Sequence, residues 1–315
     1  GLKLRRVARG GVAVFPLRGL RLPVEGDLRG LAEGPGEGLA TLCPVDDVLP
    51  LMIALLERGV ILVIISGTTY EKIAFGDLHS QIPAALRKNL YLGLGRGAYN
   101  FGFPEGELQT LHHAVPESDV LATLHRVAFD VHLRLLERHG IETDIVFSRP
   151  NYCKIDLLVK ASRDNRNHIE YSEVEAARET LSSHGYPGGI AALIADASQL
   201  GEKQGLPLRA TCDGKFLEVG LTTKADNVEY LFTLISEKHG VSATECAFWG
   251  DEFGSLDRGV PGSDAEMITD LTAEADFFDV SGSPMELPRC VHEVPGGVAA
   301  FLDFLRHQQT VGVLR

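Results

Sequence analysis

The sequence predicts an α/β protein in which a parallel sheet is interrupted by an inserted α+β unit. An apolar, β-branched run at Val60–Ile65 is typical of a strand that is buried on both faces. A second short apolar run, Cys246–Trp249, ends abruptly at Gly250. Between these two runs lies a long series of helix-like and strand-like segments. This order indicates a sheet that begins, is interrupted, and then resumes.

The first part of the chain contains the pieces of a βαβ unit. Short apolar runs predict strands, and apolar residues spaced three and four apart predict helices. The expected elements are a strand at 11–15 stopped by Pro16, a loop at 21–45, a helix at 46–57, a strand at 60–65 and a helix from Tyr70.

The middle of the chain predicts the inserted unit. Leu90–Phe103 alternates apolar residues with glycine and predicts a β-hairpin. Its GxGxG pattern has no following helix, so a dinucleotide site is not expected. The further elements expected are helices at 118–139, 171–183 and 189–203, and strands at 144–148, 152–160, 206–211 and 216–221. We therefore assign residues 85–215 to an α+β domain, and residues 1–84 with 216–315 to the domain that holds the parallel sheet.

The end of the chain returns to the parallel sheet. The expected elements are a helix at 225–239, strands at 245–249 and 275–280, and a closing helix at 298–307. No internal repeat is visible.

Composition limits the possible functions. The chain has 315 residues, of which 44% are hydrophobic and 23% charged, as in ordinary globular proteins. The net charge of −13 argues against binding to nucleic acid or to an anionic membrane. The five cysteines are far apart and form no CxxC pair, which is typical of free thiols in a reducing compartment. With no apolar run long enough to span a membrane, we expect a soluble, cytoplasmic protein. The oligomeric state is not predicted.

Carboxylates follow the later apolar run. Asp251 and Glu252 come directly after Gly250, and Asp257, Asp264 and Glu266 lie in the glycine-rich stretch beyond. Open α/β sheets bind ligands at the carboxyl ends of their strands. Oxygen ligands of this kind suit Mg²⁺, which proteins commonly share with a phosphate group. The alternative is an acidic surface loop.

Three short motifs follow one another along the chain. Ser66 ends the strand in VILVIISGTT, Lys224 begins a helix in GLTTKADNVEYL, and Gly250–Asp251 follows the later strand, with Gly262–Ser263–Asp264 beyond it. In this order they resemble the haloacid dehalogenase superfamily. The resemblance is to the branch with a large cap inserted between the second and third motifs, which includes phosphomannomutases and sugar-phosphate phosphatases. It implies a Rossmann-like core with an α+β cap.

The resemblance also implies roles for these residues. The Ser66 hydroxyl and the backbone N–H groups of Gly67 and Thr68 would bind a phosphate group, and Lys224 would pair with it. The implied catalytic residues are Ser66, Lys224 and Asp251; the implied Mg²⁺ ligands are Asp251 and Asp264, with Glu252 and Asp257 in reserve. The alternatives are a helix-capping serine and a solvated lysine.

The first family motif is altered. The family has DxDG[TS] after a strand, with the first Asp as nucleophile and metal ligand and the second as general acid–base. Here Pro16 and Arg18 stand at those two positions, and Leu20 replaces the hydroxyl residue. Proline has no oxygen that could attack phosphorus, and arginine stays protonated. Asp27, Asp46 and Asp47 are nearby in the sequence, but none of them follows an apolar strand.

Two further inferences concern the ligand. Arg149, Asn151 and Lys154 resemble the cap residues that contact the sugar phosphate in phosphomannomutases, although a solvated cap face would have the same pattern. Arg18 either completes a metal-independent anion site with Lys224 and Ser66 or forms a salt bridge with Asp251 that seals an empty pocket.

Three hypotheses follow. The first is a catalytically impaired protein that binds a phosphorylated small molecule, in particular a sugar phosphate. The second is an active phosphohydrolase or phosphomutase with a non-standard first motif and Mg²⁺ as cofactor. The third is a non-catalytic interaction subunit.

Overall fold

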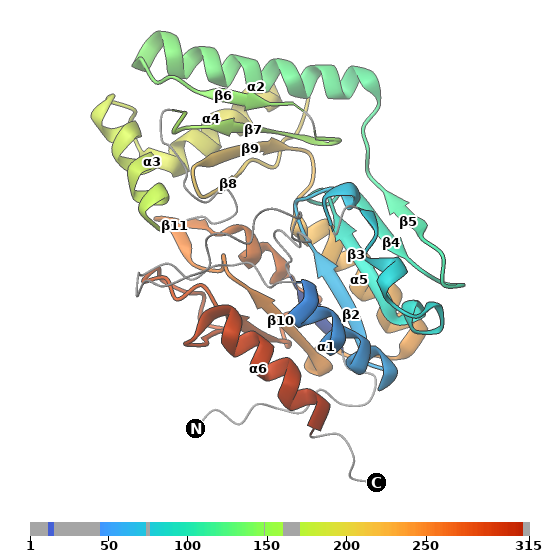
Figure 1. Cartoon of the computed structure of the whole chain (residues 1–315). Coiled ribbons are helices and arrows are strands. Elements are labelled where there is room, and N and C mark those ends of the chain that lie inside the picture. Colours follow the sequence, from blue (N-terminus) through green and yellow to red (C-terminus); the bar gives the residue numbers. More distant parts are fainter. Residues whose placement is uncertain (1–11, 16–44, 74–75, 148, 160–170, 311–315) are drawn as a thin grey trace, which may run out of the picture.

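The described residues form two main β-sheets, one above the other in Figure 1, and a separate two-stranded hairpin. The computed structural model describes residues 12–15, 45–73, 76–147, 149–159 and 171–310. The larger sheet has eight strands in the order β14-β13-β10-β1-β2-β3-β4-β5, and the smaller has four in the order β6-β7-β9-β8.

The larger sheet is parallel from β14 to β3 and antiparallel from β3 to β5. Its strands are β1 (Val12–Phe15), β2 (Ile61–Ile65), β3 (Leu90–Leu94), β4 (Tyr99–Gly102), β5 (Gln109–His113), β10 (Cys246–Gly250), β13 (Asp276–Asp279) and β14 (Val291–Glu293). Strand β1 lies between β10 and β2, because Val12 pairs with both Cys246 and Ile61. The predicted central trio of parallel strands is confirmed.

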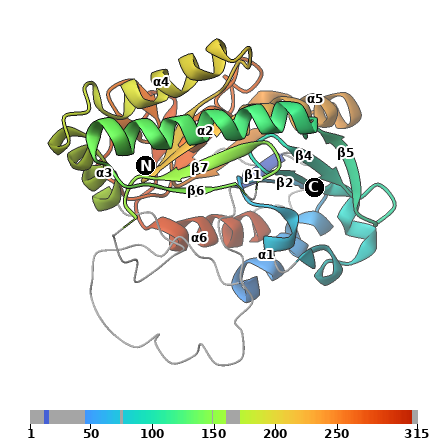
Figure 2. The ribbon, with the colours of Figure 1, turned by 90° about the horizontal axis from the view of Figure 1, so that it is seen from above.

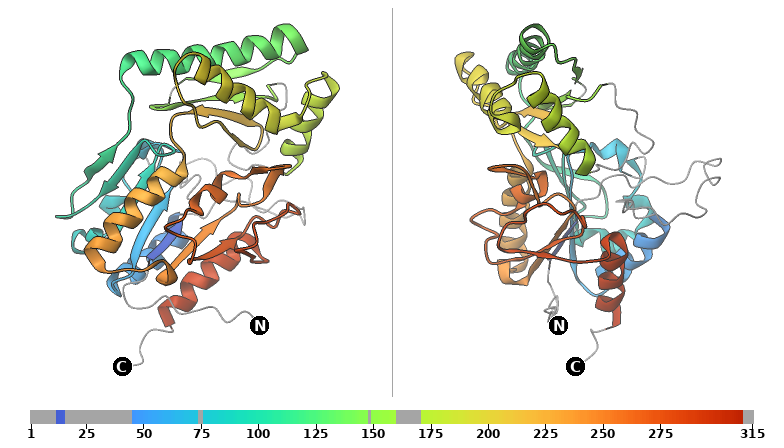
Figure 3. Two further views of the ribbon diagram at one scale, coloured as in Figure 1. Left: turned by 180° about the vertical axis from the view of Figure 1, so that it is seen from behind. Right: turned by 90° about the vertical axis from the view of Figure 1, so that its left-hand side faces the viewer.

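Helices cover both faces of this sheet (Figure 3). Helices α1 (Val45–Glu57) and α6 (Gly297–Thr310) cover one face, and α5 (Lys224–His239) covers the other. The position of β2 between these helices explains why its sequence is apolar throughout. Leu62 and Ile64 pack toward α1 and α6, while their neighbours along the strand pack toward α5. Alternating side chains therefore enter two different cores.

The smaller sheet is antiparallel, and its helices lie on the side away from the larger sheet; together they are called the cap (Figure 2). Its strands are β6 (Asp144–Val146), β7 (Tyr152–Asp156), β8 (Thr211–Asp213) and β9 (Phe216–Gly220), and its helices are α2 (Ser118–His139), α3 (Tyr171–Ser183) and α4 (Gly189–Lys203). The cap has an apolar core of its own, formed between these helices and the sheet.

A hairpin that follows β10 also contacts the cap. It consists of β11 (Ser255–Asp257) and β12 (Val260–Pro261). Leu256 and Val260 are buried within the apolar core of the cap. The Asp257 carboxylate accepts a hydrogen bond from the backbone N–H of Ile190, at the start of α4, at 3.0 Å. The cap is thus attached both through its chain connections and through this hairpin.

The structure corrects some predicted elements. The helix expected from Tyr70 is wrong: the described residues there form short 3₁₀ turns, interrupted by Gly76 in a left-handed conformation. These turns are η1 (Tyr70–Lys72), η3 (His79–Gln81) and η4 (Ala84–Asn89). The strand expected at 206–211 is also wrong, since only β8 forms in that region and Pro207 has no N–H to donate. Two further 3₁₀ turns are η5 (Ala243–Glu245) and η6 (Ser263–Met267).

Sheet pairing also differs from the predicted limits of the inserted unit, residues 85 and 215. The predicted hairpin forms as β3 and β4, but β3 pairs in parallel with β2, so both belong to the larger sheet. Strand β9, placed outside the insertion, pairs within the cap. The alternation of apolar residues predicts a strand but does not reveal which sheet it joins. The division into two domains stays a prediction. No helix in the described ranges is long and apolar enough to span a membrane.

Candidate functional site

The loop Ser66–Thr68 directly follows β2, with Ser66 buried. The Ser66 Oγ atom accepts a hydrogen bond from the Thr68 N–H at 3.2 Å. Each backbone carbonyl of the loop also accepts one. The donors are Arg96 N–H to Ser66 at 3.4 Å, the Tyr152 hydroxyl to Gly67 at 2.8 Å, and Gly95 N–H to Thr68 at 2.9 Å. The loop is therefore held from outside by the β3–β4 turn and by the cap.

Lys224 is the first residue of α5, and its side chain is 5% exposed. Thr223 and Asp226 form a capping box that fixes the start of this helix. The Lys224 ammonium donates to Ser263 Oγ at 2.8 Å and to Asp264 Oδ1 at 2.5 Å. The predicted third and fourth motifs thus meet in a buried ion pair.

Asp264 joins Lys224 to the end of β10. Its second oxygen, Oδ2, accepts hydrogen bonds from the backbone N–H groups of Asp251 and Glu252, each at 3.0 Å. Only glycine fits at position 250, because a Cβ atom there would lie 2.5 Å from Asp264 Oδ2. The structure therefore brings Asp251 and Asp264 together, as predicted. Asp264 contacts the backbone N–H of Asp251 and fixes the position of this loop.

Burial affects other carboxyl groups near this loop. Glu252 is buried and accepts a short hydrogen bond from the Ser263 hydroxyl. The Glu266 carboxylate accepts the Lys224 backbone N–H at 3.2 Å, and burial raises the pKa of Glu266 above its ordinary value. Burial likewise raises the pKa of Asp279, at the end of β13. Such shifts reflect the cost of charging a carboxyl group away from water.

Two of the carboxylates near this loop are already engaged by hydrogen bonds. Both oxygens of Asp264 accept hydrogen bonds, and those of Asp257 accept the backbone N–H groups of Ile190 and Arg258. Within the described ranges, no three His, Cys, Asp or Glu side chains are grouped as metal ligands. The family resemblance places a further metal-binding carboxylate at position 16, where this sequence has Pro16. We therefore expect Mg²⁺ to bind weakly here, because one carboxylate that would hold it is absent.

The altered first motif follows the central strand β1 in the sequence. Pro16, Arg18, Leu20 and Asp27 lie outside the described residues. The other two proposed substitutes, at positions 46 and 47, are in the first turn of α1, where the side chains are not described. Their replacement of the missing carboxylates stays a prediction.

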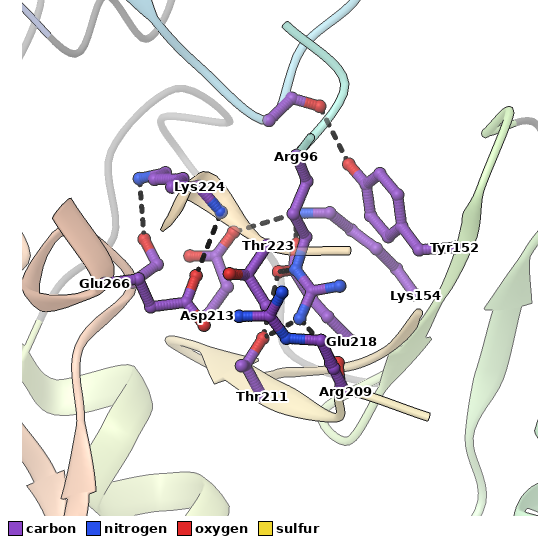
Figure 4. A network of polar contacts seen from close by, with 12 residues as sticks. Arg96, Tyr152, Lys154, Arg209, Thr211, Asp213, Glu218, Thr223, Lys224 and Glu266 are labelled. Atoms are coloured by element: carbon purple, nitrogen blue, oxygen red, sulfur yellow. Dashed lines mark hydrogen bonds and ion pairs between the residues drawn. The ribbon is translucent and has the colours of Figure 1, made fainter. Parts of the chain in front are cut away.

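Lys154, predicted to contact a substrate, belongs to a network of buried charges between the cap strands (Figure 4). Its ammonium lies 2.8 Å from Asp213 Oδ2 and 2.8 Å from Glu218 Oε1. The other oxygen of Glu218 lies 3.0 Å from Nε of Arg96. Burial opposes the charge on Glu218, but Lys154 and Arg96 outweigh it, so the pKa of Glu218 is below its ordinary value.

Arg96 is a residue that the sequence analysis missed. It lies in the β3–β4 turn with φ +56°, an uncommon conformation for a residue other than glycine, and is 2% exposed. Its guanidinium donates to the carbonyls of Thr222 (2.5 Å) and Arg209 (2.8 Å). It also donates to the Thr211 hydroxyl at 2.7 Å. One side chain of the larger sheet thus anchors the cap strands and the connection back to α5.

The other two predicted substrate residues lie beside this anchor. Asn151 is fully buried, and its amide donates to the Arg96 carbonyl at 3.3 Å and to the Thr222 hydroxyl. The guanidinium of Arg149 lies 6.0 Å from the centre of the Tyr152 ring. The hydrogen bond from Asn151 to Arg96 joins the cap to the larger sheet, whereas the contact between Arg149 and Tyr152 lies within the cap. A substrate role for Arg149, Asn151 and Lys154 stays a prediction.

Comparison with known proteins establishes the fold. No family model matches the sequence, and no curated protein matches it. The structure is similar to an IMP-bound IMP-nucleotidase from Plasmodium falciparum, with a TM-score of 0.54 and 13% identity over 97% of this chain and 70% of that one. It is also similar to a trehalose-6-phosphate phosphatase from Aspergillus fumigatus, with a TM-score of 0.52 and 13% identity over 96% of this chain and 93% of that one. The chain therefore shares the fold of these two proteins, an α/β core with a large inserted cap.

Proposed function

We propose that this protein binds a phosphorylated small molecule of the sugar-phosphate class and does not form the covalent phosphoenzyme of its structural class. The phosphate group would lie against the Ser66–Thr68 loop, Lys224 and Arg18. The rest of the ligand would face the cap. The proposal combines a preserved phosphate-binding frame with a lost nucleophile.

One observation carries the proposal. The sequence places Pro16, and not a carboxylate, directly after the central strand β1. The residues that match the flanking motifs are present: Ser66 directly follows β2, and Lys224 is fixed by the capping box and by Asp264. A chain that kept the fold only as a scaffold would not need a buried lysine at this position, since burying an ammonium group is costly.

The similar structures support the ligand class. One of them is an IMP-nucleotidase and the other a trehalose-6-phosphate phosphatase, and both IMP and trehalose 6-phosphate are phosphomonoesters. Arg18 adds a permanent positive charge where the family has a carboxylate. A phosphate site with two cationic side chains does not require a metal ion to balance the charge of the ligand.

Binding of phosphate should therefore survive removal of divalent metals. We expect calorimetry with inorganic phosphate or a hexose 6-phosphate to give the same affinity with and without a chelator. Arg18→Ala should weaken binding by about 10- to 100-fold, because it removes a charge-assisted contact. Arg126→Ala, which removes an exposed arginine on α2, serves as the matched control and should change nothing.

Two results would contradict the proposal. Absence of binding in every condition would indicate a sealed pocket, in which Arg18 pairs with Asp251. Binding that requires a divalent metal would indicate the metal-dependent site of the family.

A further inference from the structure

Three hydrogen bonds fix the orientation of the Ser66–Thr68 loop. The carbonyls of all three residues point at donors outside the loop, as described above. In a trans peptide the C=O of one residue and the N–H of the next point in opposite directions. Fixing these carbonyls therefore fixes the directions of the N–H groups of Gly67, Thr68 and Thr69, each opposite to the carbonyl of its own peptide group. Successive N–H groups on one side of a turn form a site for an anion.

Two of these N–H groups have no partner among the described residues. The Thr68 N–H is directed at Ser66 Oγ, but those of Gly67 and Thr69 make no hydrogen bond within the described part of the chain. Both residues are only partly buried. They are the donors that an anion would use.

Only one of the three loop-holding donors comes from the cap. Gly95 and Arg96 belong to the β3–β4 turn of the larger sheet, whereas Tyr152 is the first residue of β7. The Tyr152 side chain is fully buried, and the guanidinium carbons of Arg96 and Arg149 lie 5.6 Å and 6.0 Å from the centre of its ring. Burial also raises the pKa of Tyr152, so its hydroxyl keeps its proton and donates.

We propose that Tyr152 is a positioning residue for the anion loop, through which the cap sets the direction of the Gly67 and Thr68 peptide groups. This inference rests on the proposed function and names a cap residue that acts on the phosphate without touching it. The hydrogen bond from Tyr152 to Gly67 is held in place because the cap contacts the rest of the protein at two further points. Arg96 holds the cap strands at one end, and Leu256 and Val260 enter the cap core at the other.

The matched pair Tyr152→Phe and Tyr186→Phe tests this inference. Each change removes one hydroxyl from a buried tyrosine. The Tyr186 hydroxyl donates to Asp196 at 2.6 Å inside the cap, far from the loop in the sequence. We expect Tyr152→Phe to weaken binding of inorganic phosphate by about 3- to 10-fold, the effect of one hydrogen bond. Tyr186→Phe should bind phosphate as the unaltered protein does.

A spectroscopic readout separates positioning from general loss of stability. In the unaltered protein, phosphate should shift the backbone amide resonances of Gly67 and Thr69 more than those of Gly95 and Arg96. In Tyr152→Phe the free-state resonances of Gly67 and Thr68 should already be displaced, whereas Tyr186→Phe should leave them in place. The first of these measurements needs no variant, and so it applies even if Tyr152→Phe fails to fold.

The outcomes distinguish this inference from the proposed function. If the unaltered protein does not bind phosphate, both are wrong. If it binds phosphate but Tyr152→Phe binds equally well, the positioning role is overturned and the proposed function stands. If phosphate shifts other amides and leaves Gly67 and Thr69 unmoved, the loop is not the anion site.

Discussion

Hydrolysis of phosphomonoesters in the presence of Mg²⁺ is expected to remain at the uncatalysed background. Loss of a catalytic nucleophile typically lowers turnover on the order of 10⁶-fold. Pro16 and Arg18 stand where the family resemblance places the nucleophile and the acid–base. We therefore expect neither a covalent intermediate nor proton transfer from water. A steady-state assay with a panel of sugar phosphates and IMP measures this directly.

A reciprocal variant provides the control for this assay. The double change Pro16→Asp with Arg18→Asp restores the two carboxylates and one metal ligand, and any gain in Mg²⁺-dependent turnover should appear there. Turnover of the unaltered protein at about 1 to 10³ per second, as in typical enzymes, would contradict the account. In that case Asp27, Asp46 or Asp47 would be the carboxylates to replace next.

Replacement of Glu218 by glutamine is expected to lower the free energy of unfolding by about 3–5 kcal/mol. Glu218 is the carboxylate that neutralises Arg96 and Lys154 together, at 3.0 and 2.8 Å, and it is buried. Without it, the buried guanidinium of Arg96 loses its only described ion pair. Urea denaturation measures the change. Asp303→Asn, which breaks an exposed pair with Arg306, is the control and should cost at most about 1 kcal/mol.

The same residue predicts a pH dependence. The pKa of Glu218 is lower in the folded protein than its ordinary value. The contribution of Glu218 to stability is therefore complete above about pH 4.3. That contribution is lost as the pH falls from there through the lower folded pKa. The difference in unfolding free energy between the unaltered protein and Glu218→Gln should therefore shrink in that acidic range. A difference independent of pH would show that Glu218 acts by packing and not by charge.

Some site residues could be predicted from the sequence because they lie at the ends of apolar strands, at the start of a helix, or in a motif whose order along the chain is known. Ser66 follows an apolar run and Lys224 begins a helix, while Asp264 was found by its place in the order of the motifs; the structure brings Lys224 and Asp264 into contact. The parallel order of β10, β1 and β2 was also predictable, because each strand is apolar along its length. These features depend on the sequence close to each residue.

The residues that local pattern missed depend on long-range contacts. Arg96 lies in a glycine-rich turn and meets partners more than a hundred positions away, including Thr222 and Glu218. The two glycines that flank it were the available signal in the sequence, but nothing nearby revealed its partners. Tyr152 similarly donates a hydrogen bond to Gly67, although β3, β4, β5 and α2 separate the two residues in the sequence. Lys154 was predicted to contact a substrate because its true ion-pair partners, Asp213 and Glu218, are distant in the sequence and could not be recognised there.

The central claim is that a phosphate site persists without the nucleophile and without its metal ion. A crystal of the protein soaked in phosphate and Mg²⁺ tests it most directly. The account predicts a phosphate ion bound by the Ser66 hydroxyl and the N–H groups of Gly67 and Thr69, with no six-coordinate ion at Asp251. A Mg²⁺ ion coordinated by Asp251 with the phosphate as its second ligand would contradict that prediction.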